Sequence, residues 1–139
     1  MPSIFEKIVA GEIPCHRLYE DEHVLAFLDI GPVSRGHCLL IPKACHVELD
    51  DVPPETAAAL GRALPKLVAA LKAATGCDGV NVLQNNGAAA GQVVMHAHFH
   101  LIPRYVGGGG LRFEWPAGTL DTDHAQQIQA AIVAALAGA

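Results

Sequence analysis

The chain has no long apolar run, no Cys-x-x-Cys pair and no excess of basic residues. Its first residues, MPSIFEKIVAGEIP, contain no long apolar run, so we expect neither a signal peptide nor a membrane span and predict a cytoplasmic protein without membrane contact. The formal net charge is -5, whereas proteins that bind the nucleic-acid backbone need a basic surface, so nucleic acid is not the expected partner. A small phosphate ligand is compatible with this charge, because a few local donors can hold it.

Cysteine is scarce and scattered. The thiols of Cys15, Cys38, Cys45 and Cys77 show no paired spacing, which is typical of reduced cysteines in a cytoplasmic protein. Only 5% of the residues are aromatic, but 51% are hydrophobic, so the chain should fold without disulfides or metals. Its 139 residues predict a single domain over 1–139, in which 106–139 form a C-terminal loop and helix extension.

Hydrophobic periodicity and capping patterns predict an α+β fold. Ser3 and Glu6 fit the S-x-x-E capping box, so a helix should begin at Ile4 and end at Gly11. Strands are expected at 18–19, 24–30, 37–41, 79–84 and 94–102, with a long central helix at 53–75 and a C-terminal helix at 122–136. Strands joined mostly by hairpins, with helices set apart, predict an antiparallel sheet.

Three histidines, His96, His98 and His100, alternate with apolar residues in the stretch 94–102. Side chains alternate faces along a strand, so the three imidazoles should share one face and the apolar residues should face the core. A strand face that is simply exposed to water more commonly carries other polar residues. The pattern therefore indicates a functional face.

Two kinds of chemistry suit such a face. The first is a metal site, but at roughly 3.3 Å per residue the Cα atoms of His96 and His100 lie about 13 Å apart, so one ion is shared poorly unless the strand bends. The second is catalysis, because a neutral imidazole is a nucleophile and neighbouring imidazoles can donate hydrogen bonds to a phosphoryl oxygen. The small residues of 87–91 would let backbone N–H groups approach a phosphate.

The string H-A-H-F-H-L-I also fits the histidine triad pattern H-φ-H-φ-H-φ-φ, in which φ is apolar. Four further motifs occur in the same order as in that family: IFEKIVAGEIP at 4–14, LAFLDI at 25–30, GHCLLIPKACH at 36–46, and the loop 85–91 followed by Gln92. Over these motifs the chain resembles the bacterial Hint-like branch of the histidine triad superfamily.

This resemblance implies a fold and an activity. The family's fold is a five-stranded antiparallel sheet with helices, paired into a homodimer. Its members hydrolyse or transfer purine nucleoside phosphates at the α-phosphate, with phosphoramidate, adenylate or dinucleotide substrates, through a covalent nucleotidyl-histidine. The chemistry itself requires no metal.

The resemblance also assigns roles by position. His98 would attack the α-phosphorus and His100 would bind its oxygens. The backbone carbonyl of His96 would accept a hydrogen bond from Nδ1 of His98 and so leave Nε2 with a free lone pair. His46, in P-K-x-x-H, matches the family's fourth histidine. The remaining histidines, His16, His23, His37 and His124, are expected to be surface or structural residues.

The implied substrate-binding residues have simpler interpretations as well. They are Asn85, Asp29, Gly91, Gln92 and Val93 near the phosphate and ribose, and Phe5, Ile8, Ile13, Leu28 and Ile30 in an apolar slot for the base. Core packing alone would explain Phe5 and Ile8. Asp29 and Asn85 could simply shape turns, and His46 could be a surface residue.

Two positions depart from the family pattern. Many bacterial members carry C-x-x-C near the N-terminus and bind a structural zinc with two histidines, whereas this chain has Ser3 and Glu6 there, so we expect no zinc and no other cofactor. Val93 stands where relatives usually carry Ser or Thr, whose hydroxyl contacts the phosphate. Losing a hydrogen bond to a charged group, worth roughly 1.5–3 kcal/mol, should slow hydrolysis by about tenfold to over a hundredfold.

Three hypotheses follow. The first is a hydrolase of the histidine triad type, similar to nucleoside phosphoramidases. The second is a nucleotide-binding module with weak or vestigial catalysis, for which Val93 would be the first sign. The third is a metal protein that uses the three alternating histidines. The sequence leaves open the leaving group, the choice between adenine and guanine, and whether Trp115 contacts a partner subunit or packs locally.

Overall fold

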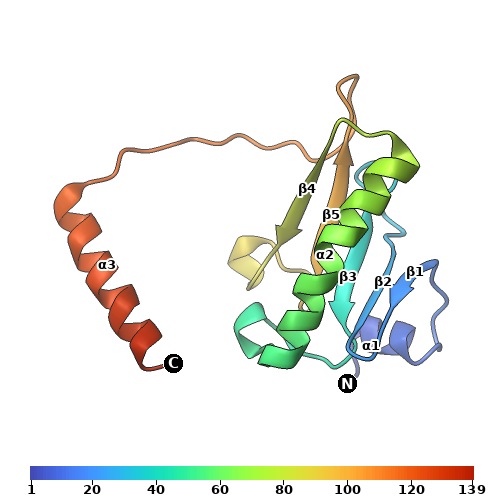
Figure 1. Cartoon of the computed structure of the whole chain (residues 1–139), viewed down its shortest axis with the longest axis horizontal. Coiled ribbons are helices and arrows are strands. Elements are labelled where there is room, and N and C mark those ends of the chain that lie inside the picture. The colour runs from blue at the N-terminus through green and yellow to red at the C-terminus, as the bar shows by residue number, and fades with distance from the viewer.

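A computed structural model describes all 139 residues. The sheet has the order β1-β2-β3-β5-β4, and all neighbouring strands are antiparallel (Figure 1). Its strands are β1 (Arg17–Glu20), β2 (Val24–Leu28), β3 (Cys38–Pro42), β4 (Gly79–Gln84) and β5 (Phe99–Arg104). The helices are α1 (Ile4–Val9), α2 (Pro54–Thr75) and α3 (Thr122–Ala137), and single 3-10 turns occur at Leu49–Asp51 and Ala88–Ala90. The predicted α+β fold is confirmed.

The long helix α2 covers one face of the sheet (Figure 1). Pro54 lies in its first turn, and the helix ends at Gly76, whose φ of 64° is a left-handed conformation that glycine adopts at little cost. The apolar side of α2 packs against alternate residues of the central strands. The buried residues of this core are Val24, Ala26, Cys38, Leu40, Ala59, Leu60, Ala63, Leu67, Leu71 and Leu101.

The opposite face of the sheet packs against α1. The capping box predicted at its start is present: the Ser3 hydroxyl accepts the Glu6 N–H at 3.0 Å, and the Glu6 carboxylate accepts the Ser3 N–H at 2.7 Å. Because side chains alternate along a strand, the residues of β2 and β3 that do not face α2 face α1. This second core contains Phe5, Ile8, Leu25, Phe27, Leu39 and Ile41.

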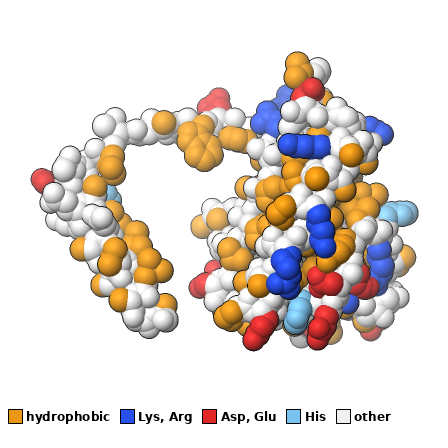
Figure 2. Space-filling view, in the orientation of Figure 1, with side chains coloured by type: hydrophobic (Ala, Val, Ile, Leu, Met, Phe, Trp, Pro, Cys, Tyr) orange, Lys and Arg blue, Asp and Glu red, His pale blue; other side chains and the backbone are white.

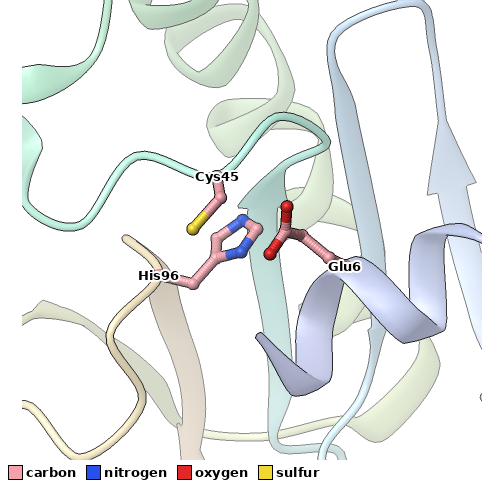
Figure 3. A group of neighbouring side chains, drawn as sticks. All are labelled: Glu6, Cys45 and His96. Atoms are coloured by element: carbon pink, nitrogen blue, oxygen red, sulfur yellow. The ribbon is translucent and has the colours of Figure 1, made fainter. Parts of the chain in front are cut away.

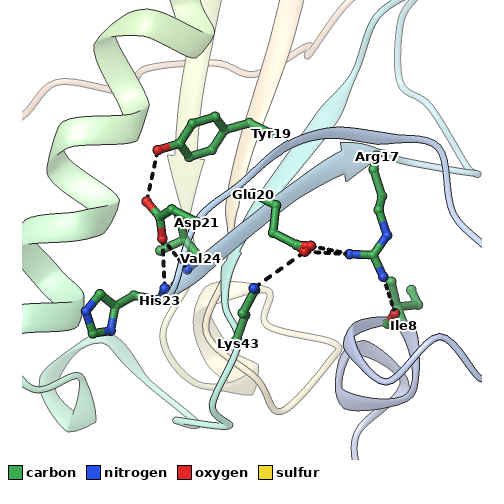
Figure 4. Close-up of polar contacts among 8 residues, drawn as sticks. All are labelled: Ile8, Arg17, Tyr19, Glu20, Asp21, His23, Val24 and Lys43. Carbon is green, nitrogen blue, oxygen red and sulfur yellow. Dashed lines mark hydrogen bonds and ion pairs between the residues drawn. The ribbon is translucent and has the colours of Figure 1, made fainter.

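Polar contacts around the β1–β2 hairpin hold α1 in place (Figure 4). Arg17 pairs with Glu20 at 2.9 Å and donates to the carbonyl of Ile8 at 3.2 Å. Lys43, just beyond β3, approaches the same Glu20 carboxylate at 3.4 Å. These contacts tie the end of α1 to two strands, so that Phe5 is held against the sheet.

The strand expected at 94–102 begins later than predicted. β5 starts at Phe99, so only His100 of the three alternating histidines lies within the sheet. Pro42 of β3 has no N–H for a ladder bond, and its carbonyl is occupied by Nε2 of His96 at 2.7 Å instead of by a backbone donor. The predicted strand was therefore wrong for its first residues: His98, although it precedes the strand, still lines the same cavity as His100, whereas His96 is buried away from that cavity.

Residues 106–139 follow the sheet: Leu111 and Trp115 line cavities beside it, and α3 stands apart from it (Figure 1). Three consecutive glycines with positive φ, Gly108–Gly110, follow β5, and an extended segment then leads to α3. This helix stands apart from the sheet and keeps apolar side chains exposed, among them Ile128, Ile132 and Leu136 (Figure 1, Figure 2). None of the helices combines the length and the apolar character needed to cross a membrane.

Candidate active site

His98 lies just before β5 and offers a lone pair. Its Nδ1 is 2.6 Å from the carbonyl oxygen of His96. A carbonyl only accepts hydrogen bonds, so Nδ1 carries the proton and Nε2 of the neutral ring keeps its lone pair. The ring is buried and packs edge-on against Phe5, with centroids 5.1 Å apart. This is the hydrogen bond that the family resemblance implied.

His100 offers the opposite function, an N–H donor. The backbone N–H of Val33 donates to Nδ1 of His37 at 3.0 Å, so neutral His37 carries its proton on Nε2. That Nε2 lies 2.9 Å from Nδ1 of His100, which must accept, and His100 therefore carries its own proton on Nε2. The ring centroids of His98 and His100 are 4.9 Å apart. A phosphoryl group beside them would meet one lone pair and one donor.

Burial keeps His37 and His100 uncharged, and at His100 the neighbouring rings contribute as well. The pKa of His100 is lowered to about 4, mainly by burial and also by the neighbouring His98 and His37, whereas Asp29 opposes the shift. Burial also lowers the pKa of His37, again against Asp29, whose Oδ2 lies 3.4 Å from Nε2 of His37. At neutral pH His37 and His100 are therefore neutral, and the hydrogen bonds keep the directions given above.

A cavity of about 400 Å³ opens beside these rings. It is lined by Ile4, Phe5, Asp29, Val33, His37, Leu39, Leu83, Asn85, Gly91, Val93, Val94, His98, His100, Ile102 and Leu111. Leu111 belongs to the C-terminal extension, so the segment after β5 forms part of the wall. A mainly apolar cleft with a few convergent polar groups is typical of a small-molecule site.

A smaller, mainly apolar cavity of about 100 Å³ adjoins the first and shares four of its lining residues, Ile4, Phe5, Asp29 and Leu39. Its other lining residues are Ile8, Ile13, Pro14, Cys15, Phe27, Leu28 and Ile30. Asp29 thus lies where the two cavities meet. Its Oδ1 also accepts the N–H of Gly31 at 2.8 Å, so the residue both shapes the turn after β2 and faces the site.

The small-residue loop before the histidines forms another wall. Gly87 and Gly91 have φ of 82° and 92°, which side chains other than glycine rarely adopt. The buried side chain of Gln92 accepts the N–H of Gly87 at 2.8 Å and donates to the carbonyl of Val47 at 2.6 Å. Gln92 therefore holds the loop and does not line the cavity, whereas Gly91 and Val93 do.

Comparison with known proteins assigns the chain to a family. A model of the HIT domain matches residues 10–107. The chain belongs to the HIT domain family. The match covers the sheet, α2 and the histidines, but not α1 or most of the C-terminal extension.

Relatives of this HIT protein include enzymes. An adenosine 5'-monophosphoramidase of Saccharomyces cerevisiae is 43% identical over 97% of this chain and 83% of that protein. An adenylylsulfatase of Arabidopsis thaliana is 50% identical over 73% of this chain, which spans about half, 51%, of that protein. The solved structure of a HIT family protein from Bacillus anthracis matches with a TM-score of 0.91 and 42% identity, over 96% of each chain.

Two of the predicted catalytic histidines lie outside the cavity of the HIT protein. His96 is fully buried, with Nε2 on the Pro42 carbonyl at 2.7 Å and Nδ1 2.8 Å from the hydroxyl of Ser3. His46 acts through its backbone, since its carbonyl accepts the N–H of Ala97 at 2.6 Å. Both residues support the segment that leads into β5, and their rings do not line the site.

His37 was expected to be a surface or structural residue without a place in the site. The structure shows that it is part of the cavity wall. It is buried, lines the cavity and contacts His100. The sequence gives only part of this result: side chains alternate along a strand, so His37 is expected on the face of Leu39. Leu39 pairs with His100 in the sheet, which brings the two histidines together.

The hydrogen bonds make the triad a poor metal site. Both ring nitrogens of His96 are engaged, and Nδ1 of His98 carries a proton. Asp29, His37 and His100 place three potential ligand atoms within 4.8 Å of one another, but the proton on Nε2 of His37 leaves that atom no lone pair for an ion. The geometry favours phosphate chemistry over metal binding.

Proposed function

We propose that this HIT protein hydrolyses or transfers purine nucleoside 5'-monophosphate groups by attack of His98 on the α-phosphorus. The observation that carries this proposal is the pairing of one free lone pair on His98 with one N–H donor on His100 at the same cavity. Attack on a phosphoryl group requires both a nucleophile and a donor for the oxygens. The activities named for the yeast and plant relatives support it.

In the first step, Nε2 of His98 forms a bond to the α-phosphorus, and the bond to the leaving group breaks with its electron pair going to the leaving group. An amine leaving group takes a proton from solvent, whereas sulfate departs as an anion. The ring becomes a nucleotidyl-imidazolium, whose Nδ1–H still donates to the carbonyl of His96. Nε2–H of His100 donates to a phosphoryl oxygen. In the second step water attacks phosphorus, the P–N bond breaks, His98 returns to the neutral form and the proton from water passes to solvent.

The two cavities suggest how the nucleotide lies. The phosphate would occupy the larger cavity beside His98 and His100, with Asn85 and Gly91 on the facing wall. The purine would enter the smaller apolar cavity, against Phe5, Ile8, Leu28 and Ile30. Asp29 lines both cavities, and in this arrangement its carboxylate would accept hydrogen bonds from the ribose hydroxyls.

The decisive experiment replaces the nucleophile. His98→Ala should lower turnover of adenosine 5'-phosphoramidate and adenylyl sulfate by more than about a thousandfold. Rapid quenching of the wild-type protein should trap one nucleotidyl group per chain, detected by mass spectrometry, and the variant should trap none. His124→Ala, in the exposed helix α3, is the matched histidine control. Unchanged turnover in His98→Ala would rule out this mechanism.

One observation favours a second candidate, a nucleotide-binding module with weak catalysis. Val93 faces the cavity with 86% of its surface exposed, and it offers no hydroxyl to the leaving group. For such a module, calorimetry should show AMP binding, whereas the quenched reaction should contain no covalent nucleotidyl-protein.

We also propose that the protein is a homodimer. The exposed apolar residues of α3 and the 82% exposure of Trp115 leave an apolar surface that a second copy would cover (Figure 2). Sedimentation velocity of the full chain should show a dimer that Ile132→Glu weakens. Gln126→Glu on the same helix adds the same charge and serves as the control, and a wild-type monomer at micromolar concentration would contradict the proposal.

A further inference from the structure

A polar cluster lies beneath the active site, around the buried His96. The cluster contains Glu6 of α1, Cys45 after β3 and His96, whose side chains point toward one another (Figure 3). Their potential ligand atoms lie within 4.8 Å of one another. Ser3 belongs to the same cluster, because its hydroxyl is 2.8 Å from Nδ1 of His96. Positions 3 and 6 are those at which the resemblance to bacterial relatives implies zinc-binding cysteines.

The side chains present do not fit a structural zinc. Such sites use four ligands, mostly thiolates and imidazoles, and a neutral serine hydroxyl is not one of them. Nε2 of His96 already donates to the carbonyl of Pro42, so Nδ1 is the only ring nitrogen left for a metal. The Ser3 hydroxyl lies within hydrogen-bond distance of that atom. A hydrogen bond thus occupies the place of a metal bond.

The direction of this hydrogen bond is fixed by its neighbours. The Pro42 carbonyl can only accept, so His96 carries its proton on Nε2 and accepts at Nδ1. The Ser3 hydroxyl must therefore donate to His96, and its oxygen accepts the N–H of Glu6 at 3.0 Å. Ser3 joins the start of α1 to the buried imidazole with both of its hydrogen-bonding functions used.

His96 in turn supports the proposed nucleophile. It lies in the irregular segment before β5, which no strand ladder holds in place. Anchors of this segment include the two hydrogen bonds of the His96 ring and the bond from the Ala97 N–H to the carbonyl of His46 at 2.6 Å. The carbonyl of His96 accepts the proton of His98 Nδ1. A shift of His96 would therefore change both the tautomer of His98 and the orientation of its ring.

We propose that Ser3 is a positioning residue of the active site: its hydroxyl fixes the imidazole of His96, and the backbone of His96 fixes the tautomer of His98. The N-terminal capping box thereby replaces the zinc that the resemblance implies for relatives with C-x-x-C. This inference rests on the proposed role of His98 as nucleophile.

The test compares four variants of the full chain in the hydrolysis of adenosine 5'-phosphoramidate. Ser3→Gly removes the hydroxyl at little cost to α1, because glycine is tolerated at a helix N-cap. Ser3→Thr retains the hydroxyl. Glu6→Ala removes the other half of the capping box, and Cys45→Ser removes the thiol, so both delete a potential metal ligand but leave the hydrogen bond between Ser3 and His96.

For Ser3→Gly we expect kcat to fall about threefold to tenfold, the effect of one neutral hydrogen bond, with KM nearly unchanged. Ser3→Thr should restore most of the rate. Glu6→Ala and Cys45→Ser should keep kcat within about twofold of the wild-type value. Glu6→Ala should also lower the melting temperature, because it removes half of the capping box of α1. If Ser3→Gly does not fold, Ser3→Asp, which retains a capping acceptor but has no hydroxyl donor for His96, makes the same comparison.

Two results would overturn the proposal. The first is a wild-type kcat in Ser3→Gly. The second is an equal loss in Glu6→Ala and Cys45→Ser together with one zinc per chain by elemental analysis, which would assign the anchoring of His96 to a metal.

Nitrogen-15 NMR of the imidazoles tests the same proposal without turnover. The wild-type spectrum should show His96 protonated on Nε2 and His98 on Nδ1, and Ser3→Gly should mix the tautomers of His98. If the wild-type protein turned over no nucleotide, the proposed function would fail, but these spectra would still decide the role of Ser3. A wild-type His96 protonated on Nδ1 or bound to metal would refute that role.

Discussion

Nε2 of His37 lies 2.9 Å from Nδ1 of His100, and the N–H of Val33 donates to the other nitrogen of His37 at 3.0 Å. The two hydrogen bonds run in one direction, from the backbone through His37 to His100. Because His100 accepts at Nδ1, only its Nε2–H is available to a ligand in the cavity. A histidine outside the triad thus decides which ring nitrogen of His100 carries the proton that faces the cavity.

Replacing His37 by Phe should therefore slow hydrolysis. His37→Phe keeps a buried ring but leaves Nδ1 of His100 without its donor, so that His100 can turn its lone pair toward the phosphate. A lost hydrogen bond to a charged group corresponds to a fall in kcat of about tenfold to a hundredfold. Steady-state kinetics measure it, with His23→Phe in the β1–β2 turn as the control. Equal rates for the two variants would show that His37 does not orient His100.

Stability should fall as the pH is lowered from about 6.5 to about 4. The pKa of His100 is about 4 in the folded protein against an ordinary value of 6.5, so within this interval the unfolded chain binds a proton that the folded protein does not. Below about pH 4 this residue causes no further loss. At about 1.4 kcal/mol per unit, the total is on the order of 3 kcal/mol. The lowered pKa values of His37 and His96 act in the same direction.

Urea unfolding of the wild-type protein and His100→Asn, at neutral pH and near pH 4, measures this effect. The variant cannot take up that proton and should lose less stability over the same interval. If both proteins lost the same free energy of unfolding, His100 would not be the source.

Val93→Ser should raise the rate with substrates that have poor leaving groups. The new hydroxyl would restore a hydrogen-bond donor at the cavity and increase phosphoramidate hydrolysis by about tenfold to over a hundredfold. Adenylyl sulfate should gain less, because sulfate departs as a stable anion without a proton. The ratio of kcat/KM for the two substrates reports the difference, and Val93→Ala controls for size. Equal gains in Ser and Ala variants would show that the hydroxyl is irrelevant.

Gly36→Ala should lower the free energy of unfolding, because there is no room for a side chain between the residues that surround Gly36. A Cβ at this position would lie 2.8 Å from Cγ2 of Thr75 and 3.2 Å from Cγ of Pro103, and the φ of 93° is itself unfavourable for alanine. We expect a loss of about 1–3 kcal/mol in the free energy of unfolding. Gly61→Ala, in α2 with no neighbouring atom within 4 Å of the new Cβ, should instead stabilise by about 0.5–1 kcal/mol. Urea titration of the two variants should give opposite signs.

The sequence predicted the fold well where the information is local. The capping box of Ser3 and Glu6, the extent of α2 and the strand at 79–84 depend on neighbouring residues or on one periodic pattern, and all are present. The strand at 94–102 failed because its start depends on partners far along the chain. The carbonyl of Pro42 accepts a hydrogen bond from the His96 ring, and the carbonyl of His46 accepts one from the N–H of Ala97. Residues 96 and 97 therefore do not continue the strand ladder.

The site was predictable in part for the same reason. Spacing and family pattern singled out His98 and His100, and the structure places both at the cavity. The contact of His37 with His100 follows from the register between two strands, which the spacing along one strand does not contain. Gln92 was expected near the substrate, but its side chain is buried. Its amide oxygen accepts the N–H of Gly87 and its amide nitrogen donates to the carbonyl of Val47, so it stabilises the loop.

Leu111 lies beyond residues 10–107, which match the HIT domain, yet it lines the same cavity as His98 and His100. If the proposed function holds, the cavity that receives the leaving group is built partly by a segment outside the residues that match the family. Sequence changes in that segment can alter which leaving groups are accepted without touching a histidine. Within the proposed function, Leu111 is thus a position at which this chain could change its substrate while His98 and His100 stay the same.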